Sequence, residues 1–221
     1  AFGRGLDIYQ RALQIAVPPQ QVPPFHMWVV APSYPQARQI WNELVSLIPR
    51  GLIQTNGVHH DEWMIYLAGT AERPWGLIEV KSAHQPESLQ AVGLDYLWIN
   101  EAQDISTEAF EKLLPTIRDP HRLGYAVIEG IPAIHNDHWF RRLFLRAQDG
   151  LKGYYAFKAT AFDNPALTDE AKQQIEEDRD IMREASWRRM YLAEYNDSAG
   201  YFTNIDAVSY THLTLPTNRE V

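Results

Sequence analysis

Short apolar runs alternate with amphipathic stretches along the 221-residue chain. The runs are rich in β-branched and aromatic residues, as buried strands are. They occupy residues 27–31, 63–67, 76–80, 96–100, 124–130 and 154–159. Helical patterns lie between them, and this alternation predicts an α/β fold in which a mostly parallel sheet carries flanking helices. Gly69, Pro74 and Gly76 separate the second and third runs and predict a hairpin there.

The clearest helical pattern follows Ser106, which has the side chain of a helix cap. Its apolar positions recur at the i, i+3, i+4 and i+7 spacing of one helix face: Phe110, Leu113, Leu114 and Ile117. Pro115 is expected to end or bend the last turn. Residues 167–195 predict two more helices, the first capped at Thr168.

Composition restricts the class of protein without choosing a function. A hydrophobic content of 45% with seven tryptophans is enough for the core of one ordinary domain. The absence of cysteine excludes disulfide and thiolate metal sites. The net charge of −8 argues against a wholly basic nucleic-acid coat, although a local basic groove stays possible. No apolar run approaches the length of a membrane-spanning helix, so we expect no membrane association.

The stretch LDYLWINEAQDI, residues 94–105, carries the candidate chemistry. Its apolar run stops at Asn100 and Glu101, and the carboxyl ends of strands are where open α/β sheets bind ligands. A carboxylate there can orient and deprotonate an attacking water if a phosphate and its metal lie across the sheet edge. A purely structural strand end is the alternative that these residues alone leave open.

Four segments resemble the ATPase half of the large terminase subunit, the motor that packages DNA into tailed-phage capsids. They follow one another at the family's spacing: WVVAPSYPQARQIWNEL (28–44), SAHQPESLQAVGLDYLWINEAQ (82–103), AVIEGIPAIHNDHWFRRLF (126–144) and residues 162–202. The resemblance extends from about Ala1 to Asp206. It implies a P-loop NTPase-like fold of the ASCE class, with ATP and Mg²⁺ as ligands.

The resemblance also assigns roles to residues. Glu101 takes the place of the catalytic glutamate, and Asn100 takes the place of the usual Mg²⁺-site aspartate. A neutral amide at that position weakens Mg²⁺ affinity relative to a carboxylate. Gly130, Ile131 and Pro132 occupy the turn that couples hydrolysis to movement, with Ile131 where a small hydroxyl residue is common.

The N-terminal sequence of the chain differs from the family pattern. No segment matches the G-x-x-x-x-G-K-[ST] loop that cradles phosphates. Gly3, Arg4 and Gly5 are interpreted as a remnant of it, so the first strand and the P-loop are expected to be missing from the sheet. A helix is predicted just after this remnant, because Asp7 and Gln10 have capping-box spacing.

The chain is therefore interpreted as truncated at both ends. Residues 1–165 would form a partial ATPase core, and residues 166–207 the closing helices and the start of a linker. Residues 208–221, which include VSYTHLTLPT, resemble the translation of a sequencing adapter and are expected to pack poorly. An ordinary edge strand is the alternative for them. The nuclease domain that should follow Phe202 is interpreted as missing.

Three further groups of residues allow more than one interpretation. Three arginines are candidates for contacts to DNA phosphates, or they form a solvated helix face with aromatic residues inward: Arg141, Arg142 and Arg146. Residues 59–62, His-His-Asp-Glu, are interpreted as a solvated turn rather than a metal cluster. The histidines at 135 and 138 are interpreted as flanking a helix cap at Asn136 or Asp137.

Three functions are compatible with these observations. The first is a fragment of the ATP-hydrolysing DNA-packaging motor, whose expected partners are double-stranded DNA, the portal protein, the small terminase subunit and copies of itself on the portal. The second is a fragment of a helicase-like P-loop motor. The third is a non-hydrolysing fragment that only binds partners. The expected location is the host cytoplasm, with a transient stay on the procapsid.

Overall fold

A computed structural model describes residues 25–69, 75–90, 92–120, 122 and 124–195. Its strands are β1 (Phe25–Ala31), β2 (Ile53–His59), β3 (Met64–Ala68), β4 (Trp75–Ser82), β5 (Tyr96–Ile99) and β6 (Tyr125–Ile128). Its α-helices are α2 (Tyr34–Leu47), α3 (Thr107–Leu113), α4 (Trp139–Gln148), α5 (Asp169–Ile181) and α6 (Glu184–Tyr191). Short 3-10 turns are η1 (Arg50–Leu52), η2 (Pro86–Ser88), η3 (Ala102–Asp104), η4 (Leu114–Arg118) and η5 (Ala161–Asp163). None of the described helices is long and apolar enough to cross a membrane.

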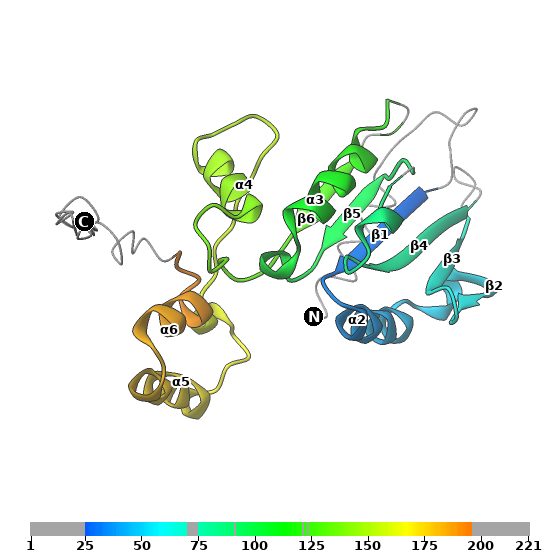
Figure 1. Ribbon diagram of the computed structural model, residues 1–221. Coiled ribbons are helices and arrows are strands. Elements are labelled where there is room, and N and C mark those ends of the chain that lie inside the picture. The colour runs from blue at the N-terminus through cyan, green and yellow to red at the C-terminus, as the bar shows by residue number, and fades with distance from the viewer. Residues whose placement is uncertain (1–24, 70–74, 91, 121, 123, 196–221) are drawn as a thin grey trace, which may run out of the picture.

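The strands form one six-stranded sheet in the order β2-β3-β4-β1-β5-β6 (Figure 1). Strands β4, β1, β5 and β6 are mutually parallel, whereas β3 pairs antiparallel with both β2 and β4. The predicted mostly parallel α/β sheet is confirmed, and so is the hairpin between β3 and β4. Strand β2 was not predicted, because its sequence IQTNGVH lacks an apolar run.

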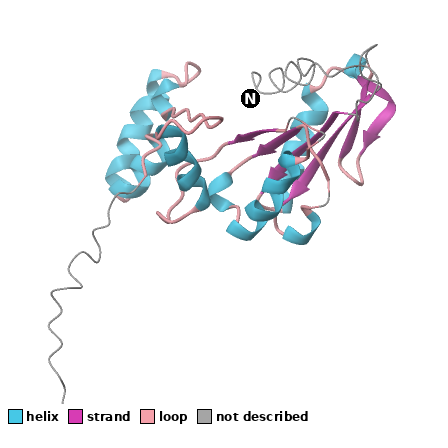
Figure 2. Ribbon diagram, turned by 90° about the horizontal axis from the view of Figure 1, so that it is seen from above, coloured by secondary structure: helices cyan, strands magenta, loops and turns pink. Residues whose placement is uncertain are grey.

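Each face of the sheet is covered by helices (Figure 2). Helix α2 packs Ile40, Trp41 and Leu44 against one face. On the other face α3 and the indole of Trp139 from α4 pack against β5, and Trp139 stacks on Phe110 at a centroid distance of 4.0 Å. Strand β5 is buried along its whole length because both layers close over it.

The predicted helix boundaries agree with the capping groups. The Ser106 hydroxyl accepts from Ala109 N at 3.2 Å, and α3 gives way to η4 at Leu114, next to Pro115. The Thr168 hydroxyl likewise accepts from Ala171 N at the start of α5. The cap predicted at Asn136 or Asp137 was wrong. His138 caps α4 instead, accepting from Phe140 N through Nδ1.

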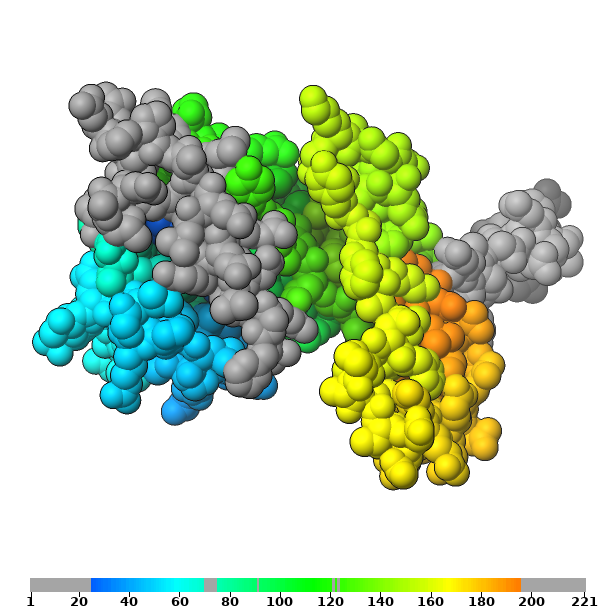
Figure 3. Space-filling view, turned by 180° about the vertical axis from the view of Figure 1, so that it is seen from behind, coloured from blue at the N-terminus to red at the C-terminus, as the bar shows by residue number. Residues whose placement is uncertain are grey.

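The strand predicted at 154–159 was also wrong. These residues form no strand, and the side chains of Tyr155 and Phe157 are 94% and 89% exposed. A strand needs a partner for its backbone N–H and C=O groups, and residues 154–159 pair with no strand of the described sheet. In the space-filling view, α5 and α6 form a lobe set apart from β2, β3 and α2 (Figure 3). The predicted N-terminal helix and the segment 208–221 lie outside the described residues.

Candidate active site

Three parallel strands bring their carboxyl ends to one edge of the sheet, and the residues after β5 are tied to both neighbours there. Asn100 N donates to Val30 O at 2.9 Å, and Ala102 N donates to Glu129 O at 2.9 Å. These bonds place Glu101 between the end of β1 and the turn at Gly130. The predicted neighbourhood of Glu101 and Gly130 is confirmed, although no role follows from position alone.

Glu101 has a left-handed backbone, with φ 52° and ψ 51°. A residue with a Cβ pays about 1–2 kcal/mol for this conformation, which glycine adopts freely. The residue is therefore held in place by its surroundings, through the hydrogen bonds on either side of it. Strain of this kind gathers at functional sites, so it supports a chemical role for the Glu101 carboxylate.

Gln103 was not predicted, yet its side chain organises this edge. Its Nε2 donates to Glu101 Oε2 at 2.7 Å and to Asp104 Oδ2 at 3.1 Å, while its Oε1 accepts from Ile131 N at 3.1 Å. The partners fix the amide orientation, since a flipped amide would face carboxylates with its oxygen. Nothing in the sequence pattern marks a glutamine two residues after the carboxylate, because its partner lies 28 residues further on.

Gly130 allows the turn after β6 to approach this edge. A Cβ at this position would lie 2.2 Å from Gln103 Oε1 and 2.9 Å from Ala102 N, too close for any side chain. Ile131 and the buried Pro132 follow, and Arg189 Nη1 of α6 donates to Pro132 O at 3.2 Å. The turn is thus held from the β5 side by Gln103 and from the helical lobe by Arg189.

This edge offers only a few side chains that could bind Mg²⁺. Within the described ranges no three His, Cys, Asp or Glu side chains gather closely enough to hold a metal. Asn100 and Glu101 nevertheless offer an amide and a carboxylate side by side, both half-buried. Mg²⁺ usually keeps several waters and takes one or two protein ligands plus substrate phosphates, so this sparse set fits a metal carried by a nucleotide.

The three candidate DNA-binding arginines lie on α4 in different surroundings. Arg141 is half-buried and its guanidinium lies 5.5 Å from the Tyr195 ring centroid, whereas Arg142 and Arg146 are exposed. Trp139 is buried, so at least this aromatic residue points inward, as the alternative interpretation proposed.

Burial lowers the pKa of His138, which favours the neutral ring that can accept a hydrogen bond at the start of this helix.

The histidines that precede β3 show no metal geometry. His59 lies 3.8 Å from Glu62, and both side chains are about half exposed, at 46% and 60%. This agrees with a solvated turn between β2 and β3. The remnant Gly3, Arg4 and Gly5 lies outside the described residues.

A mostly parallel sheet with a strained carboxylate after β5 defines an α/β protein whose candidate ligand site lies at the carboxyl edge of its parallel strands. A family model described as phage terminase large subunit matches residues 75–194. The chain therefore belongs to the phage terminase large subunit family.

Individual proteins that the chain resembles are also large terminases or parts of them. The large terminase subunit of Escherichia phage T5 is 26% identical over 187 residues, which are 82% of this chain and 40% of that protein. The large terminase ATPase domain of Thermus phage P74-26 has a TM-score of 0.65 at 21% identity, covering 87% of this chain and 84% of that one. The large terminase of another thermophilic bacteriophage, solved in complex with ATP-gamma-S, has a TM-score of 0.57 at 14% identity, covering 80% and 41%. The chain thus spans about two fifths of the length of the curated relatives it matches.

Proposed function

We propose that the chain is part of the ATP-hydrolysing motor that packages double-stranded DNA into the capsid of a tailed phage. The single observation that carries this proposal is the left-handed Glu101 at the carboxyl end of the buried β5, against the Gly130 turn. Family membership favours this function over a helicase-like motor. The thermophilic-phage large terminase solved with ATP-gamma-S supports a nucleotide ligand here.

In this proposal Glu101 orients and deprotonates the water that attacks the γ-phosphate of ATP. Its carboxylate accepts a hydrogen bond from Gln103 at 2.7 Å, so a side chain of the protein itself helps to fix its position. Asn100 stands where Mg²⁺ would be held through its water shell, and the ion would offset the charge of the phosphates. The Gly130–Pro132 turn would move with hydrolysis, because it contacts the residues that hold Glu101.

The loop that cradles phosphates has to enter beside these residues. Strand β6 is paired on one side only within the described sheet, so its other side can accept a further strand. We propose that the strand leading into the nucleotide loop pairs there, which would bring the loop to the edge that carries Glu101. The exposed segment 154–159 would then have a strand to pair with.

Partners follow from the family and remain proposals. Arg142 and Arg146 are exposed on α4 and would contact DNA phosphates, with an affinity that falls as salt rises. The portal protein, the small terminase subunit and further copies of the motor would bind the intact protein, in the host cytoplasm and on the procapsid.

Hydrolysis in a longer protein is the test of this function. The 221-residue chain should show negligible ATPase, because it lacks the loop lysine and hydroxyl. A natural protein that contains this sequence and an intact loop should hydrolyse ATP, and Glu101→Gln should lower kcat by at least about 100-fold. Glu111→Gln, at an exposed position of α3, is the matched control and should keep the parental rate. Parental hydrolysis by Glu101→Gln would contradict the role of Glu101. No hydrolysis by the parent would favour the non-hydrolysing alternative.

A further inference from the structure

The turn Gly130–Pro132 is hydrogen-bonded by side chains from two distant parts of the chain. On one side the Gln103 amide accepts from Ile131 N at 3.1 Å while donating to the Glu101 carboxylate at 2.7 Å. On the other side Arg189 Nη1 donates to Pro132 O at 3.2 Å. A continuous set of contacts therefore runs from Glu101 to helix α6.

At the Gln103 end of this path, the Gln103 side chain packs tightly against Gly130. Its Oε1 occupies the space that a Cβ on residue 130 would need, at 2.2 Å. Hydrogen bonds from an amide to a carboxylate are stronger and more directional than neutral ones. A change in the position of the Glu101 carboxylate must therefore turn the Gln103 amide, and the same amide holds Ile131 N.

The Arg189 end leads into a rigid pair of helices. Trp187 is 3% exposed and its indole donates to Ile175 O of α5 at 2.7 Å. Tyr191 donates to Asp178 of α5 at 2.8 Å. Helices α5 and α6 are therefore fixed to each other, so a displacement of Pro132 that reaches Arg189 acts on both.

We propose that Gln103 is a positioning residue that links the Glu101 carboxylate to the Gly130–Pro132 turn, and that Arg189 passes displacement of this turn to the α5–α6 pair. The use of this link in a motor rests on the function proposed above. The contacts of this link are all made between residues of the chain, so it can be tested separately from hydrolysis.

Backbone amide signals of the 221-residue chain test the first step. Gln103→Met keeps the length of the side chain and removes its hydrogen bonds, so exchange of the Ile131 amide should become at least about tenfold faster. Gly130→Ala should do the same by displacing Gln103, and it provides a second route to the result. Gln54→Met removes an amide that donates to Leu67 O on β3, and should leave Ile131 unchanged. Unchanged exchange in both Gln103→Met and Gly130→Ala would overturn the link.

A double-mutant comparison separates linkage from simple support. Glu101→Ala should shift the Ile131 amide signal in the parental chain and should not shift it further in Gln103→Met. Equal shifts in both backgrounds would overturn the role of Gln103 and assign the coupling to the backbone bond between Ala102 and Glu129, which is 2.9 Å long.

The second step uses the Trp187 indole as a reporter on α6. Glu101→Ala should shift the Trp187 Nε1–H signal in the parental chain and in Arg188→Met, but not in Arg189→Met. Arg188 is the matched control, since it lies on the same helix and pairs with Glu194 rather than with the turn. A shift that survives in Arg189→Met would overturn the role of Arg189. ATPase measurements on the longer protein bear on the proposed motor function and leave this result unchanged.

Discussion

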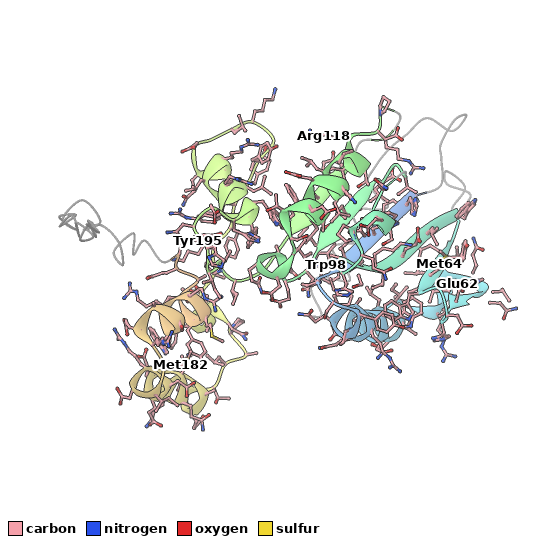
Figure 4. All side chains as sticks on the ribbon, in the orientation of Figure 1. Glu62, Met64, Trp98, Arg118, Met182 and Tyr195 are labelled. Atoms are coloured by element: carbon pink, nitrogen blue, oxygen red, sulfur yellow. The ribbon has the colours of Figure 1, made fainter. Side chains whose placement is uncertain are left out.

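The two edges of the sheet are built differently. Strand β2 closes one edge with the mostly polar sequence IQTNGVH, and its register with β3 shifts between Ile53 and Val58. Strand β6 forms the other edge with the apolar sequence YAVI in regular parallel register, and Tyr125 is 45% exposed. Figure 4 shows Glu62 and Met64 at the β2–β3 end of the sheet, with Trp98 of β5 away from that end.

Polar sequence and irregular register protect an edge from further pairing, whereas a flat apolar edge invites it. Parallel strands are also normally covered on both sides by other strands and helices. The β2 edge is therefore unsuited to a further strand, whereas β6 has the sequence of an interior strand while it lies at an edge of the described sheet.

Proline substitutions in β6 should reveal a large difference in stability between its paired side and its open side. Tyr125 N donates to Asp95 O, just before β5, and Glu129 N donates to Ile99 O at its end. The alternation of a parallel ladder therefore directs Val127 N toward β5 and Ala126 N toward the open side. Val127→Pro should lower the free energy of unfolding by about 3 kcal/mol or more, because it removes a ladder bond. Ala126→Pro should cost at most about 1 kcal/mol. Urea unfolding of the two variants measures the difference, and equal losses would mean that β6 is not an open edge.

The stability of the protein should fall in acid because of a buried carboxylate on β4, away from the open β6 edge. Glu79 of β4 is 5% exposed and accepts from His26 at 2.6 Å, from Lys81 at 2.5 Å and from Trp28 at 2.9 Å. Burial alone would raise the pKa of Glu79, but the hydrogen bonds from His26, Lys81 and Trp28 outweigh it and lower this pKa from 4.5 to about 2. Because the folded-state pKa is depressed, the stabilisation is present above about pH 4.5 and is lost as the pH falls toward 2.

The size of this effect is about 3 kcal/mol, from about 1.4 kcal/mol for each pKa unit. Tryptophan fluorescence during urea unfolding between pH 7 and pH 3 should show a loss of about 2 kcal/mol in the parental chain, because the loss is complete only below pH 2. Glu79→Gln should be less stable at pH 7 and should lose less stability on acidification. Glu111→Gln, at an exposed position, should keep the parental pH profile. An unchanged profile in Glu79→Gln would show that other groups carry the acid sensitivity.

The sequence predicted the parts of the fold that depend on local pattern. The apolar run at 96–100 identified β5, and Ser106 and Thr168 identified the starts of α3 and α5. The polar β2 was missed because its pairing with β3, rather than its own composition, makes it a strand. Residues 154–159 were predicted wrongly for the converse reason, since their apolar pattern fits a strand that finds no partner in the described sheet.

Some residues of the candidate site could likewise be predicted from local sequence, and others could not. Glu101 and the Gly130–Pro132 turn were predicted from motifs, and their proximity from parallel-sheet geometry. Gln103 and Arg189 could not be predicted, because each acts through a side chain that meets a partner 28 or 57 residues away. The left-handed backbone of Glu101 also leaves no mark in the sequence, since glutamate has no preference for it.

The smallest expected effect concerns that backbone, at the end of β5 beside the open edge. Glu101→Gly and Glu101→Ala both remove the carboxylate and its bond to Gln103, so they differ only in the backbone and one methyl group. Glycine should be the more stable variant by about 1 kcal/mol, because φ 52° strains alanine and not glycine. At Glu111, within α3, the order should reverse, with alanine more stable by about 1 kcal/mol. Urea unfolding of the four variants gives both differences. If alanine were also favoured at residue 101, the backbone there would not be left-handed, and the strain that supports a chemical role for Glu101 would be absent.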